Sequence, residues 1–241
     1  MVIAACQPPD IQNDIEGSLS KIVEYAQMAE SDGAALVCYP ECFLQGYVVD
    51  EDETGQRAID LSSEQFGGLL KQLSHLKPIL VVGLIELEGE RVFNSAVVVQ
   101  QGRLLGTYRK SKLLPREKEV FLPGENYPLF NCDGIPFGIN ICNDLNYPES
   151  TLGLSTQGAR LMVCPCNNML RYQNAEVWKE KHNEIRAQRS VEGGVWLLSS
   201  DVTGERDGRI SYGPTALIDP QGSVVAQVPL GREGLLIQEI F

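Results

Sequence analysis

The chain has 241 residues, of which 43% are hydrophobic and 22% charged, and its formal net charge at pH 7 is −12. This length fits one domain, 1–241, with a core of its own. The acidic balance argues against nucleic acid and anionic membrane surfaces as partners, because both require a basic face. No stretch approaches 18 apolar residues, so we expect no membrane span.

The amino-terminal segment and the cysteines predict the compartment. The segment MVIAACQPPD has no basic region, and its apolar run is too short for a signal peptide. The seven cysteines are an odd number, and the chain is large enough to fold without disulfides. We therefore expect a reducing environment, the cytoplasm.

Strand and helix patterns alternate through the first half of the chain. Apolar residues recur at helical spacing over 19–29, and Gly33 stands where a glycine would end that helix. A turn at Gln101-Gly102 joins two alternating runs into a hairpin. The predicted elements are a strand at 2–7, the helix around 19–29, a strand at 34–40, a helix at 63–76, a strand at 78–87 and the hairpin strands 93–100 and 103–110.

The same alternation restarts after residue 132 and closes with a hairpin around Gln221-Gly222. The predicted elements are a strand at 136–141, a helix near 148–158, a strand at 160–164, a helix near 175–192, a strand at 194–200, the two hairpin strands and a final strand, GLLIQEI. Many strands separated by helices, some of them joined by hairpins, predict a layered α/β domain with one or more mixed sheets.

Three reactive side chains stand at predicted strand ends. Glu41 follows ALVCYP, Lys110 ends LLGTYRK, and Cys142 ends the strand in FGINICNDLNYPES. Sites in layered α/β folds form at the carboxyl ends of strands, so the three side chains are expected to converge. The alternative readings are a solvated charge for Glu41 and Lys110, and a small core hydrophobe for Cys142.

The chemistry of these residue types suits nucleophilic catalysis. A thiol is only a few per cent thiolate at neutral pH, so a nucleophilic cysteine needs a base. His75 and His182 lie in helix-like stretches and make weak partners. A carboxylate such as Glu41 could instead take the thiol proton and return it to a leaving amine.

An oxyanion formed at Cys142 would have donors nearby. Lys110 is one, and the backbone N–H groups of Asn143 and Asp144, just before a helix start, are others.

Five ordered segments resemble the nitrilase superfamily, the carbon–nitrogen hydrolases, over nearly the whole chain. They are VIAACQPPDIQNDIEGSLSKI, LVCYPECFLQGY, GTYRKSKLLPREKEVFLPG, FGINICNDLNYPE and GPTALIDPQGSVVAQVPLGREGLLIQEI. By this resemblance the family's catalytic glutamate falls on Glu41, its lysine on Lys110 and its nucleophile on Cys142. A second family glutamate, five positions before the glycine of EVFLPG, falls on Glu119, and Glu117 is interpreted as a solvated charge.

The resemblance implies a four-layer αββα sandwich with two mixed sheets. It also implies an amidohydrolase that cleaves a non-peptide C–N bond through a cysteine thioester and releases ammonia, without a metal ion or organic cofactor. Relatives usually dimerise through the helices that correspond to 148–158 and 175–192, so a homodimer is expected. Trp178 and Ile185 are either anchors of that interface or residues facing their own sheet.

The expected substrate is a small neutral amide. Several carboxylate-binding branches of the family place an arginine four residues after the nucleophile, where this chain has Asn146. Arg171 could still supply a charge from the loop after the next strand. The proposed substrate-binding residues are Asn143, Asn146, Asn167 and Asn168, and further possible pocket residues are Cys42, Cys166 and Met169.

Other readings remain open on the sequence alone. The enzyme could be an N-carbamoyl amine hydrolase, or the chain could be a catalytically inactive relative that only binds. A zinc site built from Cys38, Cys42, Cys164 and Cys166 is disfavoured, because the spacings C-x₃-C and C-x-C are poor for zinc.

Overall fold

The computed structural model describes residues 1–241 and contains two large mixed sheets. In the first sheet β1 pairs parallel with β2 and antiparallel with β16. Its strands, in spatial order, are β16 (Gly234–Glu239), β1 (Val2–Gln7), β2 (Ala34–Cys38), β4 (Ile79–Glu88), β5 (Arg91–Gln100) and β6 (Arg103–Arg109), with β3 (Ile59–Asp60) paired to β4.

The second sheet repeats this mixed arrangement. Its central strand β9 pairs parallel with the strands on both sides, and antiparallel strands lie at both edges. In spatial order the strands are β15 (Val224–Gln227), β14 (Ala216–Ile218), β11 (Trp196–Ser200), β9 (Leu161–Pro165), β8 (Ile135–Ile139) and β7 (Phe130–Cys132).

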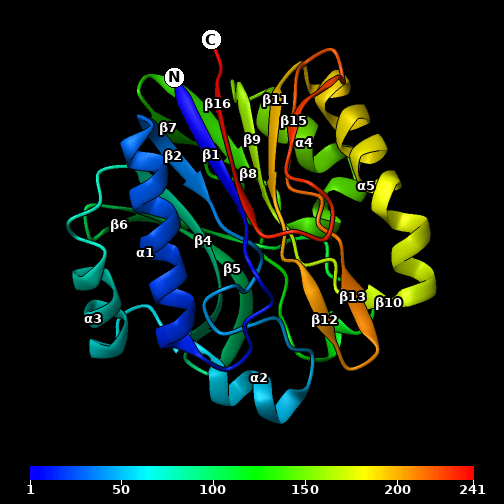
Figure 1. The fold of residues 1–241 in the computed structure, drawn as a ribbon. Coiled ribbons are helices and arrows are strands. Elements are labelled where there is room, and N and C mark those ends of the chain that lie inside the picture. The colour runs from blue at the N-terminus through cyan, green and yellow to red at the C-terminus, as the bar shows by residue number, and fades with distance from the viewer.

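Helices cover the outer face of each sheet (Figure 1). The helices α1 (Ile15–Ser31) and α3 (Glu64–Gln72) lie beside the first sheet, and α4 (Pro148–Ser155) and α5 (Tyr172–Gly193) lie beside the second. The layers run helix, sheet, sheet, helix, which confirms the predicted four-layer αββα sandwich.

Side-chain alternation along the strands builds three buried layers. On β1, Ile3 and Ala5 join the core between the two sheets, whereas Ala4 and Cys6 join the core under α1 and α3. This is the period of two that a strand buried on both faces must have. A third, smaller core lies between the second sheet and the helices α4 and α5.

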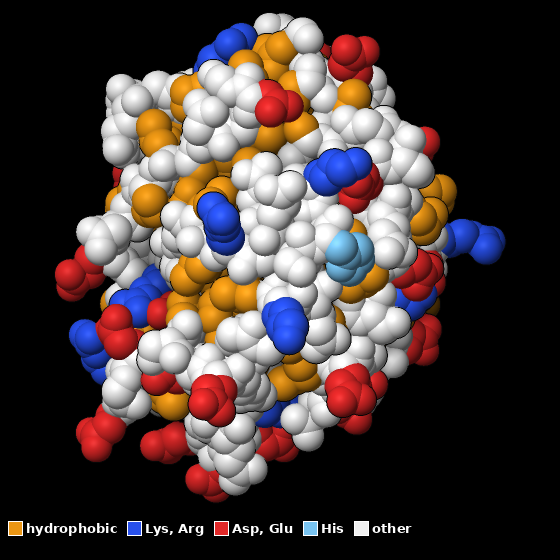
Figure 2. Space-filling model, turned by 90° about the vertical axis from the view of Figure 1, so that its left-hand side faces the viewer, with side chains coloured by type: hydrophobic (Ala, Val, Ile, Leu, Met, Phe, Trp, Pro, Cys, Tyr) orange, Lys and Arg blue, Asp and Glu red, His pale blue; other side chains and the backbone are white.

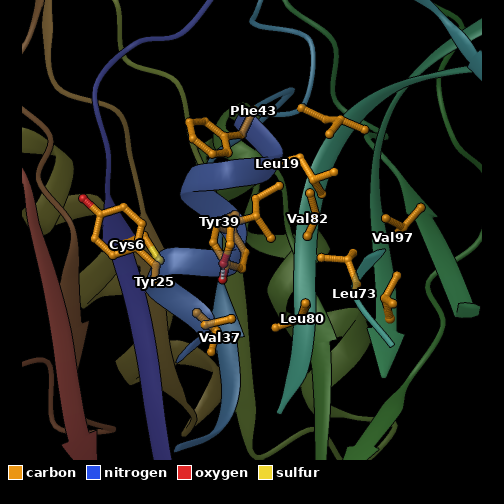
Figure 3. Close-up of a cluster of buried hydrophobic side chains, with 14 of the residues drawn as sticks. Cys6, Leu19, Tyr25, Val37, Tyr39, Phe43, Leu73, Leu80, Val82 and Val97 are labelled. Carbon is orange, nitrogen blue, oxygen red and sulfur yellow. Dashed lines mark hydrogen bonds between the residues drawn. The ribbon is translucent and has the colours of Figure 1, made fainter. Parts of the chain in front are cut away.

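The core between α1 and the first sheet contains large buried aromatic side chains, among them Tyr39 and Phe43 (Figure 3). Tyr39 directly follows β2 and stacks against Phe43, with the ring centroids 6.4 Å apart. Its hydroxyl donates to the carbonyl of Ile22 on α1 at 2.7 Å, so its polar atom is satisfied inside the core. This packing fixes the start of the segment that carries Glu41.

Several short elements were not predicted. They are the short strands β3 and β7, the helix α2 (Glu51–Arg57), the 3₁₀ turns η1 (Glu117–Glu119) and η2 (Cys142–Asn146), and a third sheet of β10 (Leu170–Arg171), β13 (Arg209–Ser211) and β12 (Gly204–Arg206). The helix α2 has the sequence EDETGQR and buries only Thr54. It is started by the side chain of Asp50, which accepts a hydrogen bond from the backbone of Glu53.

Acidic side chains are visible on the surface of the molecule. On the face shown in Figure 2 they gather along the lower edge, at the level of α2, whose first turn contains Glu51, Asp52 and Glu53. None of the helices combines the length and the apolar character that crossing a membrane requires.

Candidate active site

Glu41 lies on a tight turn directly after β2 and is 1% exposed. The turn crosses β4 at Gly83, where a Cβ atom would lie 2.1 Å from the carbonyl oxygen of Pro40 and 2.8 Å from the Cα of Glu41. Only glycine allows that approach. The next residue, Cys42, has a φ of 49°, in the left-handed region that few side chains adopt. The left-handed backbone at Cys42 and the absence of a side chain at Gly83 together let the turn direct Glu41 into the interior.

Lys110 follows β6 and meets Glu41 inside the molecule. Its Nζ lies 2.6 Å from Glu41 Oε1 and 2.7 Å from Glu117 Oε1, and the lysine is 1% exposed. Buried charges persist where they are paired and hydrogen-bonded, as this ammonium is.

The second carboxylate beside Lys110 is Glu117, so the assignment to Glu119 is wrong. Glu117 is fully buried, whereas Glu119 is exposed. Besides Lys110, Glu117 accepts hydrogen bonds from the Tyr47 hydroxyl at 2.9 Å and from the Leu114 amide at 2.7 Å. The tight turn η1 points one glutamate inward and the other, two residues on, toward solvent.

Asn94 joins the two carboxylates. Its Nδ2 donates to Glu41 Oε1 at 2.7 Å and lies 3.4 Å from Glu117 Oε1. Glu41 Oε1 is therefore occupied by Asn94 and Lys110. Glu41 Oε2 accepts only the backbone N–H of Asn167, at 3.1 Å, and keeps free capacity to accept a proton.

Cys142 lies on the bend between β8 and α4, with a φ of 44°. The buried carboxylate of Asp144 holds this bend. It accepts the N–H of Ile141 at 2.8 Å, the N–H of Lys112 at 2.7 Å and the Tyr108 hydroxyl at 2.7 Å. Asp144 thus ties the cysteine bend to the segment that follows Lys110.

The electrostatics keep the resting thiol protonated. A hydrogen bond with Cys166, then burial and the charge of Glu41, raise the pKa of the Cys142 thiol well above its usual value, against the opposing effect of Lys110. Burial also raises the pKa of Glu41, with Lys110 opposing the rise and Glu117 adding to it. A thiol held in this form needs a base, and a carboxyl with a raised pKa is a better proton acceptor than an ordinary one.

The ammonium of Lys110 stays charged. Burial acts to lower its pKa, but Glu41, Cys142 and Glu117 together hold that pKa well above the usual value. The site therefore contains a fixed positive charge next to a neutral sulfur.

The cysteine sulfur lies at a cavity of about 190 Å³, which fits a small organic molecule. One wall comes from α5, where Asn174, Trp178, His182 and Arg186 recur every four residues on one helix face. These residues were not predicted as pocket residues. Burial and then Arg186 lower the pKa of His182 to about 3, so this imidazole is neutral at physiological pH.

Three of the four predicted substrate-binding residues lie at the cavity. Asn143, Asn146 and Asn168 line it, as does Cys166. Asn167 does not line it. Its backbone N–H contacts Glu41, and its side-chain oxygen lies 3.4 Å from the N–H of Met169.

The other pocket candidates also lie elsewhere. Met169 belongs to the core under α1, and Cys42 to a small cluster with Ile85 and Phe121. Arg171 lines a separate surface hollow, and the guanidinium at the cavity is that of Arg186.

The remaining cysteines are free thiols. Cys164 and Cys166 lie with their sulfurs 3.5 Å apart. No group of three or more His, Cys, Asp or Glu side chains that could hold a metal ion is present, which leaves the zinc reading without a site.

Known proteins resemble this chain over nearly its whole length. The family model of the carbon-nitrogen hydrolases matches residues 2–241. A nitrilase from Pyrococcus abyssi is 29% identical over 227 residues, which cover 92% of this chain and 82% of that protein. An (R)-stereoselective amidase from a Pseudomonas species is 26% identical over 237 residues, covering 97% of this chain and 82% of that protein.

Solved structures of an amidase from Nesterenkonia sp. AN1, of the nitrilase superfamily, have the same fold. A cysteine-to-alanine mutant matches with a TM-score of 0.85 at 26% identity, covering 98% of this chain and 89% of that one. A glutamate-to-glutamine mutant, also with a TM-score of 0.85 and 26% identity, covers 100% of this chain and 93% of that one. It shows the result of Michael addition of acrylamide at the active site cysteine of that amidase.

Proposed function

Because the chain belongs to the carbon–nitrogen hydrolase family, we propose that it hydrolyses a small neutral amide through a thioester on Cys142 and releases ammonia. The observation that carries this proposal is the buried arrangement of Glu41, Lys110 and Glu117 next to the cysteine bend. It combines a proton acceptor and a fixed positive charge beside a nucleophile.

The first half of the reaction forms the thioester. Glu41 Oε2 takes the thiol proton while the sulfur attacks the amide carbon, and the carbonyl π bond becomes an oxyanion. Lys110 and the backbone N–H of Asn143, in the first turn of η2, stabilise that oxyanion. Glu41 then gives its proton to the nitrogen, the C–N bond breaks, and ammonia leaves.

The second half regenerates the enzyme. A water molecule gives a proton to Glu41 Oε2 and attacks the thioester carbon. The C–S bond breaks, and Glu41 returns the proton to the sulfur as the carboxylic acid leaves. Every proton in this scheme passes through one carboxyl, and no metal ion or organic cofactor is needed.

The preference for a neutral substrate rests on the charges at the cavity. The guanidinium of Arg186 lies 3.7 Å from Asp201 and donates to the carbonyl of Pro214 at 2.7 Å. It is therefore already paired. The position four residues after the cysteine holds Asn146, whose amide donates to Asn143 Oδ1 at 2.8 Å. No free cationic side chain lines the cavity for a substrate carboxylate.

A panel of short aliphatic amides, ω-amides and N-carbamoyl amines tests the proposal through ammonia release. We expect turnover of neutral amides that fit about 190 Å³, with ω-amides slower because their carboxylate meets no free cation. Turnover of carbamoyl compounds alone would support the N-carbamoyl hydrolase instead. No ammonia from any compound, and no covalent adduct, would support a protein that only binds.

We also propose that the chain forms a homodimer in the cytoplasm. The helices α4 and α5 carry apolar side chains in solvent, namely Leu152 at 38%, Val177 at 53% and Val191 at 54% exposure. Burying them between two copies would be favourable. Light scattering should give twice the mass of the 26.6 kDa chain, and Val191→Glu should shift the mass toward one chain. A single-chain mass for the unmodified protein at micromolar concentration would contradict the dimer.

A further inference from the structure

The side-chain amide of Asn168 has a fixed orientation. Its backbone N–H donates to Asp201 Oδ1 at 3.0 Å, and its Nδ2 donates to Asp201 Oδ2. Rotating the amide by 180° would place its oxygen against a carboxylate oxygen, and two acceptors repel each other. Asn168 therefore directs its Oδ1 away from Asp201.

Asp201 is itself held in place. It is fully buried, and its Oδ1 also accepts the N–H of Val202 at 2.9 Å. Its Oδ2 lies 3.7 Å from the Nη2 of Arg186. Arg186 is fixed in turn by Asn183 Oδ1 at 3.1 Å and by the carbonyl of Pro214. These contacts define one orientation for the carboxylate, and so for the asparagine that donates to it.

The side-chain oxygen of Asn168 accepts a long hydrogen bond from the thiol of the nucleophile. Asn168 Oδ1 lies 3.9 Å from the Cys142 sulfur, and Asn168 lines the cavity. The preceding residue, Asn167, donates its N–H to Glu41 Oε2, the oxygen that carries the proton. The neighbouring residues Asn167 and Asn168 thus contact the two groups of the site, Asn167 through Glu41 Oε2 and Asn168 through the sulfur.

We propose that Asn168 determines specificity by accepting an N–H of the leaving –NH₂ group, so that the site selects primary amides over esters. Asp201 and Arg186 are positioning residues that act through Asn168. This inference rests on the proposed function and names its substrate class more narrowly.

The chemistry of the intermediate supports this role. When the sulfur has attacked a primary amide, the nitrogen carries two N–H bonds and a lone pair. The lone pair takes the proton from Glu41, and one N–H can donate to Asn168 Oδ1. An ester offers an oxygen with no N–H at that place, which leaves the Asn168 oxygen without a donor. Sites built to pair a polar group reject analogues that lack it.

Propionamide and methyl propionate, which share one acyl group, are the probes. For each we would measure kcat and KM with the unmodified enzyme and with Asn168→Ala. We expect Asn168→Ala to lower kcat/KM for the amide by about 10- to 100-fold. The value for the ester should change by less than about 3-fold, because that substrate makes no such hydrogen bond. The amide-to-ester ratio should therefore fall by at least about 10-fold.

Two further variants distinguish the positioning of Asn168 by Asp201 from a general disturbance of the cavity. Asp201→Asn removes the acceptor that fixes the amide, and it should lower the same ratio, mainly through kcat. Asn174→Ala removes another asparagine of the cavity, on α5, and should leave the ratio within about 2-fold of the unmodified enzyme. The ester also forms the acyl-enzyme, so its burst counts folded active sites in each variant.

Equal losses for the amide and the ester in Asn168→Ala would overturn the inference, since a purely structural role affects both alike. The same holds if Asn174→Ala lowers the ratio as much. The proposed function fails in a different way, through the absence of any acyl adduct on Cys142 from either probe in the unmodified enzyme.

Discussion

Replacing Cys142 with alanine is expected to abolish the acyl adduct and to reduce ammonia release by at least about 10⁴-fold. In the proposed mechanism the Cys142 sulfur is the atom that forms the thioester. The adduct is measured by intact mass after mixing with a reactive amide, and turnover by ammonia. Because Cys142 is only half-buried, the alanine variant should remain folded.

A matched control uses another cysteine. Cys132 lies in β7, is 2% exposed and is not at the cavity. Cys132→Ala should therefore keep the adduct and most of the turnover, although it loses some packing. If Cys142→Ala retained turnover within about 10-fold of the unmodified enzyme, the thioester mechanism would be wrong.

The three strand-end residues were found from the sequence because each follows an unmistakable apolar run. Glu41, Lys110 and Cys142 come after β2, β6 and β8. What the sequence does not state is which strands are neighbours. Lys110 and Glu41 belong to one sheet and Cys142 to the other, and their meeting depends on how the two sheets pack. The resemblance to a family supplied that information before the structure did.

The short elements were not predicted because their sequences show no periodic pattern of apolar residues. The strands β10, β12 and β13 span only two or three residues, fewer than an alternating pattern needs. The helix α2 has no apolar stripe, and only its cap at Asp50 signals its start. Such elements form because the rest of the fold brings their backbones together.

The α5 wall of the cavity has a spacing that is readable in the sequence, but only two of its residues were interpreted, Trp178 as an interface or sheet-facing residue and His182 as a weak partner for the thiol. Asn174, Trp178, His182 and Arg186 stand four residues apart, the spacing of one helix face. A face of such mixed polarity suits a pocket better than a core. Which surface that face meets is decided by the orientation of the helix over its sheet, and the sequence does not fix it.

The error at Glu119 has a geometric cause. Counting positions back from Gly124 selects a residue in the sequence, but it does not say which way that side chain points. Here η1 tightens the chain over three residues, and the inward-facing glutamate lies two positions earlier. A shift of two residues on such a turn reverses burial, as the fully buried Glu117 and the exposed Glu119 demonstrate.

Substituting Glu117 with glutamine is expected to lower kcat/KM by about 10²-fold, whereas Glu119→Gln should leave it within about 2-fold. Glu117 holds the Lys110 ammonium at 2.7 Å and raises the pKa of Glu41 through charge repulsion. Without that charge Lys110 keeps only the ion pair with Glu41, and Glu41 becomes a weaker base. The two glutamates lie in one turn and differ mainly in burial, so each controls for the other.

The pH profile separates this effect from simple loss of structure. The acidic limb of kcat/KM reports the ionisation of the base in the free enzyme. Glu117 raises the pKa of Glu41, so Glu117→Gln should lower that pKa and move the acidic limb to lower pH. A structural defect alone would lower the whole profile without moving the limb. A limb that stays in place, or an equal loss of activity in Glu119→Gln, would show that Glu117 does not act through Lys110 and Glu41.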